Sequence, residues 1–311
     1  MRRNITLMAG LALAVPVLTA AAPAHAAPAE ATAQAANTCS VESGGLTAAK
    51  NTVDRYVNAT SPITVKPVDT MALKPFGDRA ISLSTNWVWD DDLNPDQMSY
   101  DGHVVSGGVM YQAHQWVEKG TGGKVVSSSM TRVGSGWDAF RTLTQSWSLE
   151  TSGHRMYALR NDGVLFRWNL TPQNDGTNVW HAAGSYPGFS AVKAVTLLSR
   201  TSTYDTLLAT TRGGALYTIH IPLRSPMKPV VKPVRRSTWQ GFETLLTARC
   251  GNYGTLLLGI DKETGSGYLY AVGHANGTAT VIKSLGKVPA TFDDQLDFSW
   301  ASVVAAPLFG E

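Results

Sequence analysis

Apolar and polar residues alternate over short stretches of this chain. From Val164 to Leu170, and again from Ala215 to Ile221, every second residue is apolar. Successive side chains of a β-strand point to opposite faces, so this spacing predicts half-buried strands. A short apolar run precedes each stretch, and turn residues such as Asn161-Asp162-Gly163 separate the two. The pattern therefore predicts antiparallel hairpins.

A four-residue motif recurs in these hairpins: glycine, any residue, Leu or Met, then Tyr or Phe. Its copies are Gly108-Val109-Met110-Tyr111, Gly163-Val164-Leu165-Phe166, Gly214-Ala215-Leu216-Tyr217 and Gly267-Tyr268-Leu269-Tyr270, with aromatic residues 55, 51 and 53 positions apart. Phenylalanines that open apolar stretches recur in step, at Phe76, Phe140, Phe189, Phe242 and Phe292. Each interval holds about four short strands. An all-β fold of four-stranded antiparallel blades, a β-propeller, is the architecture that this period predicts.

The two ends of the repeat region predict how the ring closes. After Phe292 only one or two strands remain, around Trp300, and residues 63–68 could form one strand ahead of Phe76. Because an open ring would expose strand edges, we expect N- and C-terminal strands to combine in one composite blade. This gives five blades, with four blades and a swapped strand as the alternative. The propeller is assigned to residues 61–311.

The segment ahead of the propeller has two predicted parts. Arg2 and Arg3, an apolar run to Ala22 and the small-residue site Ala24-His25-Ala26 are typical of a secretory signal, residues 1–26, cleaved near Ala26. Residues 27–60 are predicted to be an N-terminal arm, in which Leu46, Val53, Tyr56 and Val57 indicate one short helix. The sequence thus predicts a secreted protein with no inserted membrane segment.

Composition and net charge limit the classes of partner that the protein is expected to bind. The chain has 311 residues, 16% of them charged, and a net charge of +3. A nearly neutral chain has no general attraction for polyanions, so nucleic acid is not an expected partner. Its two cysteines, Cys39 and Cys250, are predicted to form a disulfide in an oxidising compartment. One buried and one exposed thiol is the alternative.

The repeats resemble the tachylectin family, which are five-bladed propeller lectins. The likeness rests on Gly134-Ser135-Gly136-Trp137-Asp138-Ala139-Phe140 and on Asn161-Asp162-Gly163-Val164-Leu165-Phe166, with diverged copies over roughly residues 70–311. The resemblance implies that loops between blades bind N-acetylated amino sugars. In this chain Tyr186 replaces the tryptophan of one unit, and the last unit, before Phe292, has no aromatic residue there.

A lectin needs aromatic faces for the C–H groups of a sugar and planar polar groups for its hydroxyls. The predicted carbohydrate-binding residues are Trp137, Asp138, Asn161, Asp162, Tyr186, Trp239 and Gln240. The alternative is that the tryptophans wedge adjacent blades together and that Asn161 and Asp162 only build a turn.

One acidic stretch suggests a metal. Asp90, Asp92, Asn94 and Asp96 alternate along the chain, with Asp101 at the twelfth position, which is the ligand spacing of a calcium loop. Pro95 stands where a helical calcium loop requires glycine, so an EF-hand is not expected. Calcium in a propeller loop and a solvated acidic turn are the two interpretations, and no other cofactor is predicted.

Catalytic motifs do not stand out. The sequence has no G-x-S-x-G elbow, no P-loop and no zinc spacing among its seven histidines. Asp205, Glu243 and Asp297 could serve a propeller glycosidase, but only their charge selects them. The sequence favours a glycan-binding protein without catalysis; a non-sugar interaction or structural protein and a glycosidase are the alternatives. The oligomeric state is not predicted.

Overall fold

A computed structural model describes residues 39–147, 153–174, 176–302 and 307–311. The signal and most of the arm (residues 1–38) lie outside the described residues. The described elements are strands, apart from a short 3-10 helix at Trp137–Ala139. Among the described residues, no helix has the length and apolar character to cross a membrane.

Three antiparallel sheets have four strands each, in chain order. Their strands are β10 (Phe140–Ser146), β11 (His154–Arg160), β12 (Leu165–Pro172) and β13 (Asn178–Tyr186); β14 (Val192–Arg200), β15 (Tyr204–Thr211), β16 (Leu216–Pro222) and β17 (Val230–Arg235); and β18 (Thr244–Cys250), β19 (Gly254–Asp261), β20 (Ser266–Val272) and β21 (Ile282–Thr291). The strands that the alternating residues 164–170 and 215–221 predict are confirmed as β12 and β16.

The other strands form a ten-stranded sheet. They are β1 (Ser40–Leu46), β2 (Thr52–Asn58), β3 (Thr64–Val65), β4 (Asp69–Ala72), β5 (Leu83–Ser84), β6 (Trp87–Asp90), β7 (Gln97–Ser106), β8 (Val109–Glu118), β9 (Val125–Ser135) and β22 (Leu296–Ser302). A parallel pairing of β22 with β6 joins its two parts. In one part β22, β1 and β2 are followed by β3 and β4, which pair with the two ends of β2. In the other part β5 and β6 pair with the two ends of β7, followed by β8 and β9.

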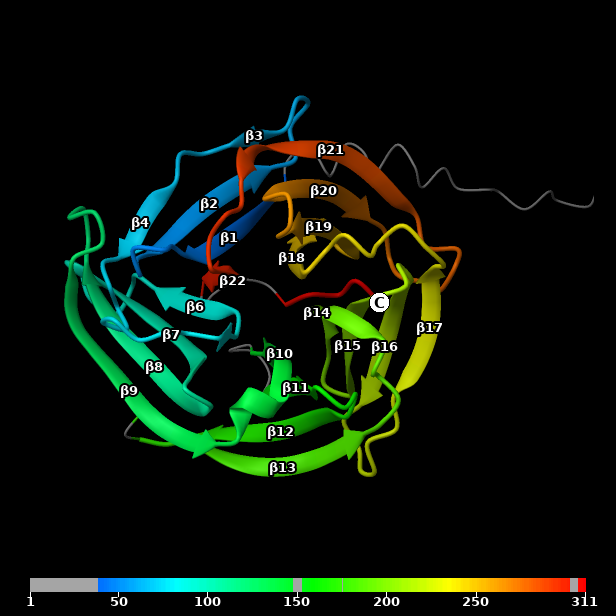
Figure 1. Ribbon diagram of the computed structural model, residues 1–311, viewed down its shortest axis with the longest axis horizontal. Coiled ribbons are helices and arrows are strands. Elements are labelled where there is room, and N and C mark those ends of the chain that lie inside the picture. The colour runs from blue at the N-terminus through cyan, green and yellow to red at the C-terminus, as the bar shows by residue number, and fades with distance from the viewer. Residues whose placement is uncertain (1–38, 148–152, 175, 303–306) are drawn as a thin grey trace, which may run out of the picture.

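The sheets follow one another around a common centre (Figure 1), where β10 contacts β14, β14 contacts β18, and β18 contacts β1 and β22. The C-terminal strand β22 pairs with the N-terminal strand β1, so the two ends of the chain complete one sheet, as the sequence predicted. A disulfide between Cys39 and Cys250, 211 residues apart, ties β1 to the β18–β21 sheet. This confirms the predicted pairing.

The predicted short helix is wrong. Leu46 ends β1, and Val53, Tyr56 and Val57 belong to β2. The two strands pair in register from Ser40 with Asn58 to Leu46 with Thr52. Non-local pairing with β22 overrides the weak local spacing. The ring therefore starts at Ser40, and residues 40–60 are not an arm.

The four copies of the motif occupy equivalent places, at the start of the third strand of their units: β8, β12, β16 and β20. Their third residues, Met110, Leu165, Leu216 and Leu269, are all buried. Gly163 has a φ of 88°, a left-handed value that a hairpin turn requires and glycine adopts without strain. The turn chemistry in the sequence thus marks the same corner of each unit.

A repeated hydrogen bond links each of these corners to the next unit. An aromatic residue donates its backbone N–H to a turn glycine carbonyl: Trp137 to Gly108 (3.0 Å), Phe189 to Gly163 (2.9 Å), Trp239 to Gly214 (3.0 Å) and Phe292 to Gly265 (2.9 Å). Phe140 and Phe242 lie three positions beyond their units' donors, whereas Phe189 and Phe292 are the donors themselves. The recurring phenylalanines of the sequence therefore occupy two different positions in their structural units.

Candidate functional site

The two predicted sugar-stacking tryptophans are buried between sheets. Trp137 is 7% exposed, with its ring centroid 4.8 Å from Phe140 and 5.4 Å from Trp168. Trp239 is 5% exposed and lies 4.8 Å from Tyr270. Neighbouring rings cover their faces, so in this conformation neither can stack on a sugar. The structure places them as packing residues, which was the alternative.

Their predicted polar partners are exposed, in turns at the same end of the sheets. Asn161 Nδ2 donates to the backbone carbonyl of Asp138 (3.3 Å), and Asp162 forms an ion pair with Arg160 (2.6 Å). Tyr186 is 40% exposed, and Gln240 is exposed next to the buried Trp239. None of the five lines a described cavity. A carbohydrate site at these turns stays a prediction.

The predicted calcium ligands form a turn instead of a converging set. Asp90 Oδ1 accepts from the backbone N–H of Asp92, and Asn94 Oδ1 from that of Asp96, both at 2.9 Å. Asp101 lies in β7 and its Oδ1 is 2.8 Å from His114 Nδ1. The carboxylates that do approach one another are those of Asp90, Asp91 and Asp92. Calcium binding stays a prediction.

A cavity that the sequence did not predict opens between the β5–β9 part and the β10–β13 sheet. Its volume is about 250 Å³. We call it the open groove. Its side walls hold two tryptophans and several planar polar side chains: Trp89, Asp90, Asp101, His103, Gln112, Gln145, Trp147, His154 and Asn178. Aromatic faces beside planar polar groups are the combination that sugar binding requires.

The aromatic walls are half-buried and held in place. Trp89, in β6, donates its indole N–H to Glu42 Oε1 (3.1 Å), a residue of β1. Trp147 follows β10, and its ring lies 5.4 Å from that of His154 in an edge-on arrangement. Each ring thus has a fixed orientation and part of its surface toward solvent.

The polar wall is a chain of amide side chains whose hydrogen bonds all run in the same direction. Gly176 O can only accept, so Gln112 turns its Nε2 to it (2.7 Å). Gln112 Oε1 then accepts from Asn178 Nδ2 (3.0 Å). The remaining amide oxygen, Asn178 Oδ1, is buried and has no hydrogen-bond partner among the described residues. A ligand or water is the usual partner of such an atom.

The charges of the open groove are negative. Desolvation by burial lowers the pKa of His103 and of His154 to about 4, so both are neutral at pH 7. Of the described lining residues, Asp90 and Asp101 are then the charged ones. His114, beside the groove, has a raised pKa because its ring hydrogen-bonds to Asp101.

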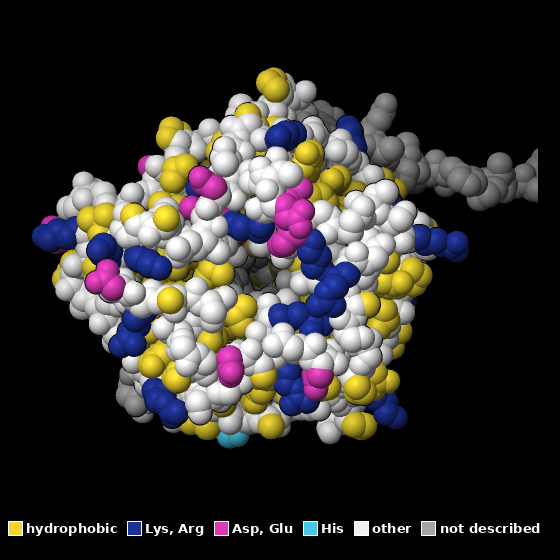
Figure 2. Space-filling view, in the orientation of Figure 1, with side chains coloured by type: hydrophobic (Ala, Val, Ile, Leu, Met, Phe, Trp, Pro, Cys, Tyr) yellow, Lys and Arg dark blue, Asp and Glu magenta, His cyan; other side chains and the backbone are white. Residues whose placement is uncertain are grey.

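The open groove adjoins the centre of the ring. Two cavities, of about 310 and 440 Å³, are lined by the inner strands, and the space-filling view shows the hollow at the centre (Figure 2). Trp89 and Trp147 line both the open groove and the larger cavity. Glu42 also lines that cavity, and desolvation raises its pKa to about 7 and that of nearby Asp54 to about 8. These two carboxyl groups therefore gain and lose protons near neutral pH, and each affects the titration of the other.

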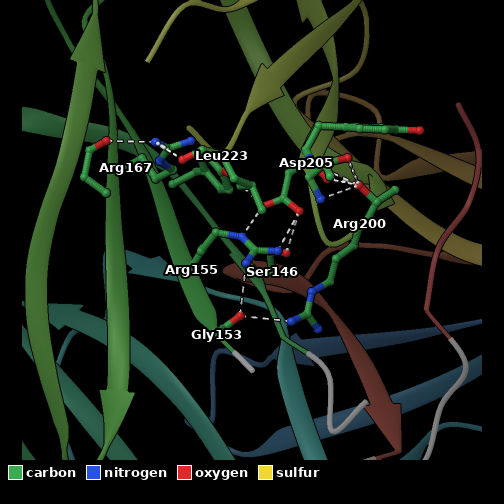
Figure 3. Close-up of polar contacts among 12 residues, drawn as sticks. Ser146, Gly153, Arg155, Arg167, Arg200, Asp205 and Leu223 are labelled. Atoms are coloured by element: carbon green, nitrogen blue, oxygen red, sulfur yellow. Dashed lines mark hydrogen bonds and ion pairs between the residues drawn. The ribbon is translucent and has the colours of Figure 1, made fainter. Parts of the chain in front are cut away.

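The next inter-sheet position, between β10–β13 and β14–β17, is filled by an ion pair. Asp205, with no exposed surface, accepts from Arg155 Nε (2.6 Å), Tyr157 Oη (2.7 Å) and Ser146 Oγ (3.2 Å) (Figure 3). Arg200 donates to Gly153 O (2.9 Å) at the edge of this cluster. Asp205 is therefore a packing residue, out of reach of a substrate.

The other two carboxylates raised by the glycosidase alternative line the smaller central cavity. Glu243 forms an ion pair with Lys193, and Asp297 forms one with Lys262 (2.7 Å). Burial raises the pKa of Asp297 to about 6 despite this partner. Both carboxylates bridge neighbouring sheets through their lysines.

A second inter-sheet groove, between β14–β17 and β18–β21, is occupied by residues 307–311; we call it the filled groove. Phe309 bridges to Ser199, and Gly310 O accepts from the backbone N–H of Ala275 (2.6 Å). The Glu311 carboxylate lies 2.9 Å from His220 Nδ1, contacts Thr206 Oγ1 and is 3.8 Å from Lys232 Nζ. The segment is an extended, acidic occupant of a groove lined by donors.

Known proteins give a structural likeness without a sequence relationship. No family model and no curated protein matches the sequence. A variant of the Aleuria aurantia lectin AAL in complex with Fucα1-6GlcNAc is 12% identical, with a TM-score of 0.42 over 80% of this chain and 79% of that one. The BP39L lectin from Burkholderia pseudomallei is 12% identical, at 0.39 over 79% and 69%. Drosophila Plexin A in complex with Semaphorin 1b is 9% identical, at 0.31 over 79% and 72%. At these TM-scores the likenesses carry no argument about a site, so the chemistry of the grooves has to come from this chain alone.

Proposed function

We propose that the protein is a five-bladed β-propeller that binds glycans in the open groove, without catalysis. The blade count comes from the three four-stranded sheets and the two parts of the ten-stranded sheet. Strand β22 then provides the inner strand of the blade built from β1 to β4. Closure by strands from both ends removes the exposed edges that an open ring would have.

The observation that carries the glycan proposal is the lining of the open groove. Trp89 and Trp147 are half-buried, so each offers ring surface to a ligand and keeps a packed side. The amides of Gln112 and Asn178 and the carboxylates of Asp90 and Asp101 lie in the same cavity. The tachylectin resemblance implies N-acetylated amino sugars, so amino sugars with and without the acetyl group are the first candidates to test.

The exposed residues Asp138, Asn161, Asp162, Tyr186 and Gln240 form the second candidate surface, at the opposite end of the strands. We also propose that residues 1–26 direct export and are removed. The disulfide supports this proposal, because such bonds persist in oxidising compartments.

Binding to a glycan array, followed by calorimetry with the best glycan, tests the proposal. Trp147→Ala is expected to weaken binding about ten-fold or more, because stacking on one ring contributes about 1.5 kcal/mol. Tyr186→Ala, at the opposite end, serves as the matched control and is expected to bind as the unaltered protein does.

Three results decide between the sites. Binding lost in Trp147→Ala and kept in Tyr186→Ala supports the open groove. The reverse pattern moves the site to the turn surface. If the unaltered protein binds no glycan on the array, the lectin proposal fails and an interaction protein on the same scaffold takes its place.

A further inference from the structure

Two buried side-chain atoms of the open groove have no described hydrogen-bond partner, and both can accept. The amide chain ends at Asn178 Oδ1, an oxygen without a described partner. His103 is 3% exposed and neutral at pH 7, and its Nδ1 lies 3.1 Å from Gln145 Oε1. If Nδ1–H donates to that oxygen, His103 Nε2 carries a lone pair, and it too has no described partner. A complementary ligand would therefore be rich in donors.

The charge of the groove requires the same kind of ligand. Asp90 and Asp101 line it, Asp91 and Asp92 continue the acidic turn outside, and no lysine or arginine is among the described lining residues. Each cation beside the groove already has a partner, and that of His114 is Asp101 itself, so Asp90 is the lining carboxylate without an ion pair among the described residues. Lys119 Nζ donates to the backbone carbonyls of Asp91 (2.6 Å) and Asn94 (3.0 Å), and His114 pairs with Asp101.

The aromatic walls are compatible with a cation. Trp89 and Trp147 line the cavity that the two carboxylates line. An ammonium group is attracted to the face of an indole ring, and the attraction grows when the site is partly desolvated.

In the filled groove the lining side chains match the charge of the occupant. His220 in β16 and His114 in β8 each lie three residues after the tyrosine of their motif. Their cross-strand partners are Thr206 in β15 and Asp101 in β7. The two pairs therefore occupy equivalent positions, which we call the rung. At this rung the filled groove offers donors to the acidic Glu311. The open groove carries Asp101 there instead.

Resting on the proposed function, we propose that the open groove binds the protonated amine of an amino sugar, and so prefers glucosamine units to N-acetylglucosamine units. The ammonium group supplies three donors to Asn178 Oδ1 and His103 Nε2, and a positive charge to Asp90. An acetamide supplies one donor and no charge, so it would leave one of these acceptors without a partner and the carboxylate without a counter-charge.

The experiment titrates the full chain with three probes while following tryptophan fluorescence and heat of binding. The probes are hexamers of β-1,4-linked glucosamine, of N-acetylglucosamine and of glucose. We expect the glucosamine hexamer to bind at least about ten-fold more tightly than the other two, with an affinity that falls as salt is added.

Charge-removing variants locate the amine. Asp90→Asn and Asp101→Asn keep the acceptor oxygen that each turn or partner uses, and each is expected to weaken glucosamine binding about five-fold. Asp293→Asn makes the same charge change at an exposed position that lines no described cavity, and it is expected to leave binding unchanged. Trp147→Ala should weaken all binding to this groove.

Failure of this inference differs from failure of the proposed function. Equal or tighter binding of the N-acetylglucosamine hexamer, lost in Trp147→Ala and unaffected by Asp90→Asn and Asp101→Asn, overturns the amine preference and keeps the lectin. Weakening by Asp293→Asn equal to that of the groove variants assigns the effect to net charge and also overturns it. Binding of no sugar in any experiment overturns both.

Discussion

The open groove and the filled groove lie between neighbouring sheets of one repeating scaffold, yet one holds a segment of the chain and the other is a cavity. In the filled groove, Thr206, His220 and Lys232 surround the Glu311 carboxylate. In the open groove the same rung holds Asp101 and His114, and these two satisfy each other. The backbone positions correspond, so the two grooves differ at this position in the charge of their side chains.

The inter-sheet position between β10–β13 and β14–β17 differs from both grooves. There Asp205, Arg155 and Tyr157 fill the space with side chains. A groove thus stays open to a ligand only where it is filled neither by a segment of the chain nor by packed side chains. Divergence among the repeats, which the sequence shows as loss of pattern, is what creates a distinct site.

The largest effect is expected for the filled position. Asp205→Ala leaves Arg155 buried without its counter-charge and should lower the free energy of unfolding by about 3–5 kcal/mol in urea denaturation. Asp162→Ala removes an exposed aspartate from an arginine pair and should leave stability nearly unchanged. Equal effects of the two would show that Asp205 does not support the interface.

Lowering the pH should reduce the free energy of unfolding of the protein, because His103 is buried in the neutral form. Its pKa in the folded protein, about 4, is below its ordinary value of 6.5, so the unfolded chain binds the extra proton first. Stability is therefore lost as pH falls from about 6.5 to about 4, by up to about 3 kcal/mol. His103→Gln should flatten this part of the pH profile, whereas His181→Gln, at an exposed position, should not.

Emptying the filled groove tests whether the occupant stabilises the ring. Removal of residues 307–311 breaks backbone hydrogen bonds at Leu198, Arg200 and Ala275 and should cost about 2 kcal/mol. The free peptide Pro-Leu-Phe-Gly-Glu should raise the melting temperature of the shortened protein again. The same peptide with Gln in place of Glu should do so less, and an equal effect would contradict charge matching.

The smallest expected effect on stability is at the open groove itself. Trp147→Ala should cost about 1 kcal/mol or less, because the ring is half-exposed and leaves no closed cavity. Trp137→Ala, which removes a ring packed between sheets, should cost about 3–5 kcal/mol. Similar melting temperatures for these two variants would mean that Trp147 is a packing residue and not a ligand platform.

Local chemistry explains why much of the fold could be predicted. Hairpin turns and alternating apolar positions are properties of neighbouring residues, so the four motif copies were placed in equivalent strands. The helix predicted around Val53 failed because β2 pairs with β1, β3 and β4 in one sheet, and the spacing of its few apolar residues did not reveal that pairing. Buried Arg55 bonds Asp294 (2.5 Å), 239 residues away, and neighbouring residues give no sign of that contact.

The candidate site was much less predictable than the fold. Trp137 and Trp239 attracted attention because they recur in the repeat, but recurrence follows from packing between units as readily as from binding. Trp89 and Trp147 lie outside the shared pattern. A tryptophan beside amides from other strands could have signalled the open groove only if the arrangement of those strands had been known.

The amino-acid sequence was enough to predict the strands of the repeats, their turns, the period of the repeat and a bond between the two cysteines, because each depends on local spacing or on a choice between two alternatives. Only the tertiary structure decided which side chains meet between sheets. That juxtaposition depends on how units more than 40 residues apart in the chain pack around one centre, as the 42-residue separation of His103 and Gln145 illustrates. Side-chain exposure and charge matching arise from this packing, which is why the groove chemistry becomes visible only in three dimensions.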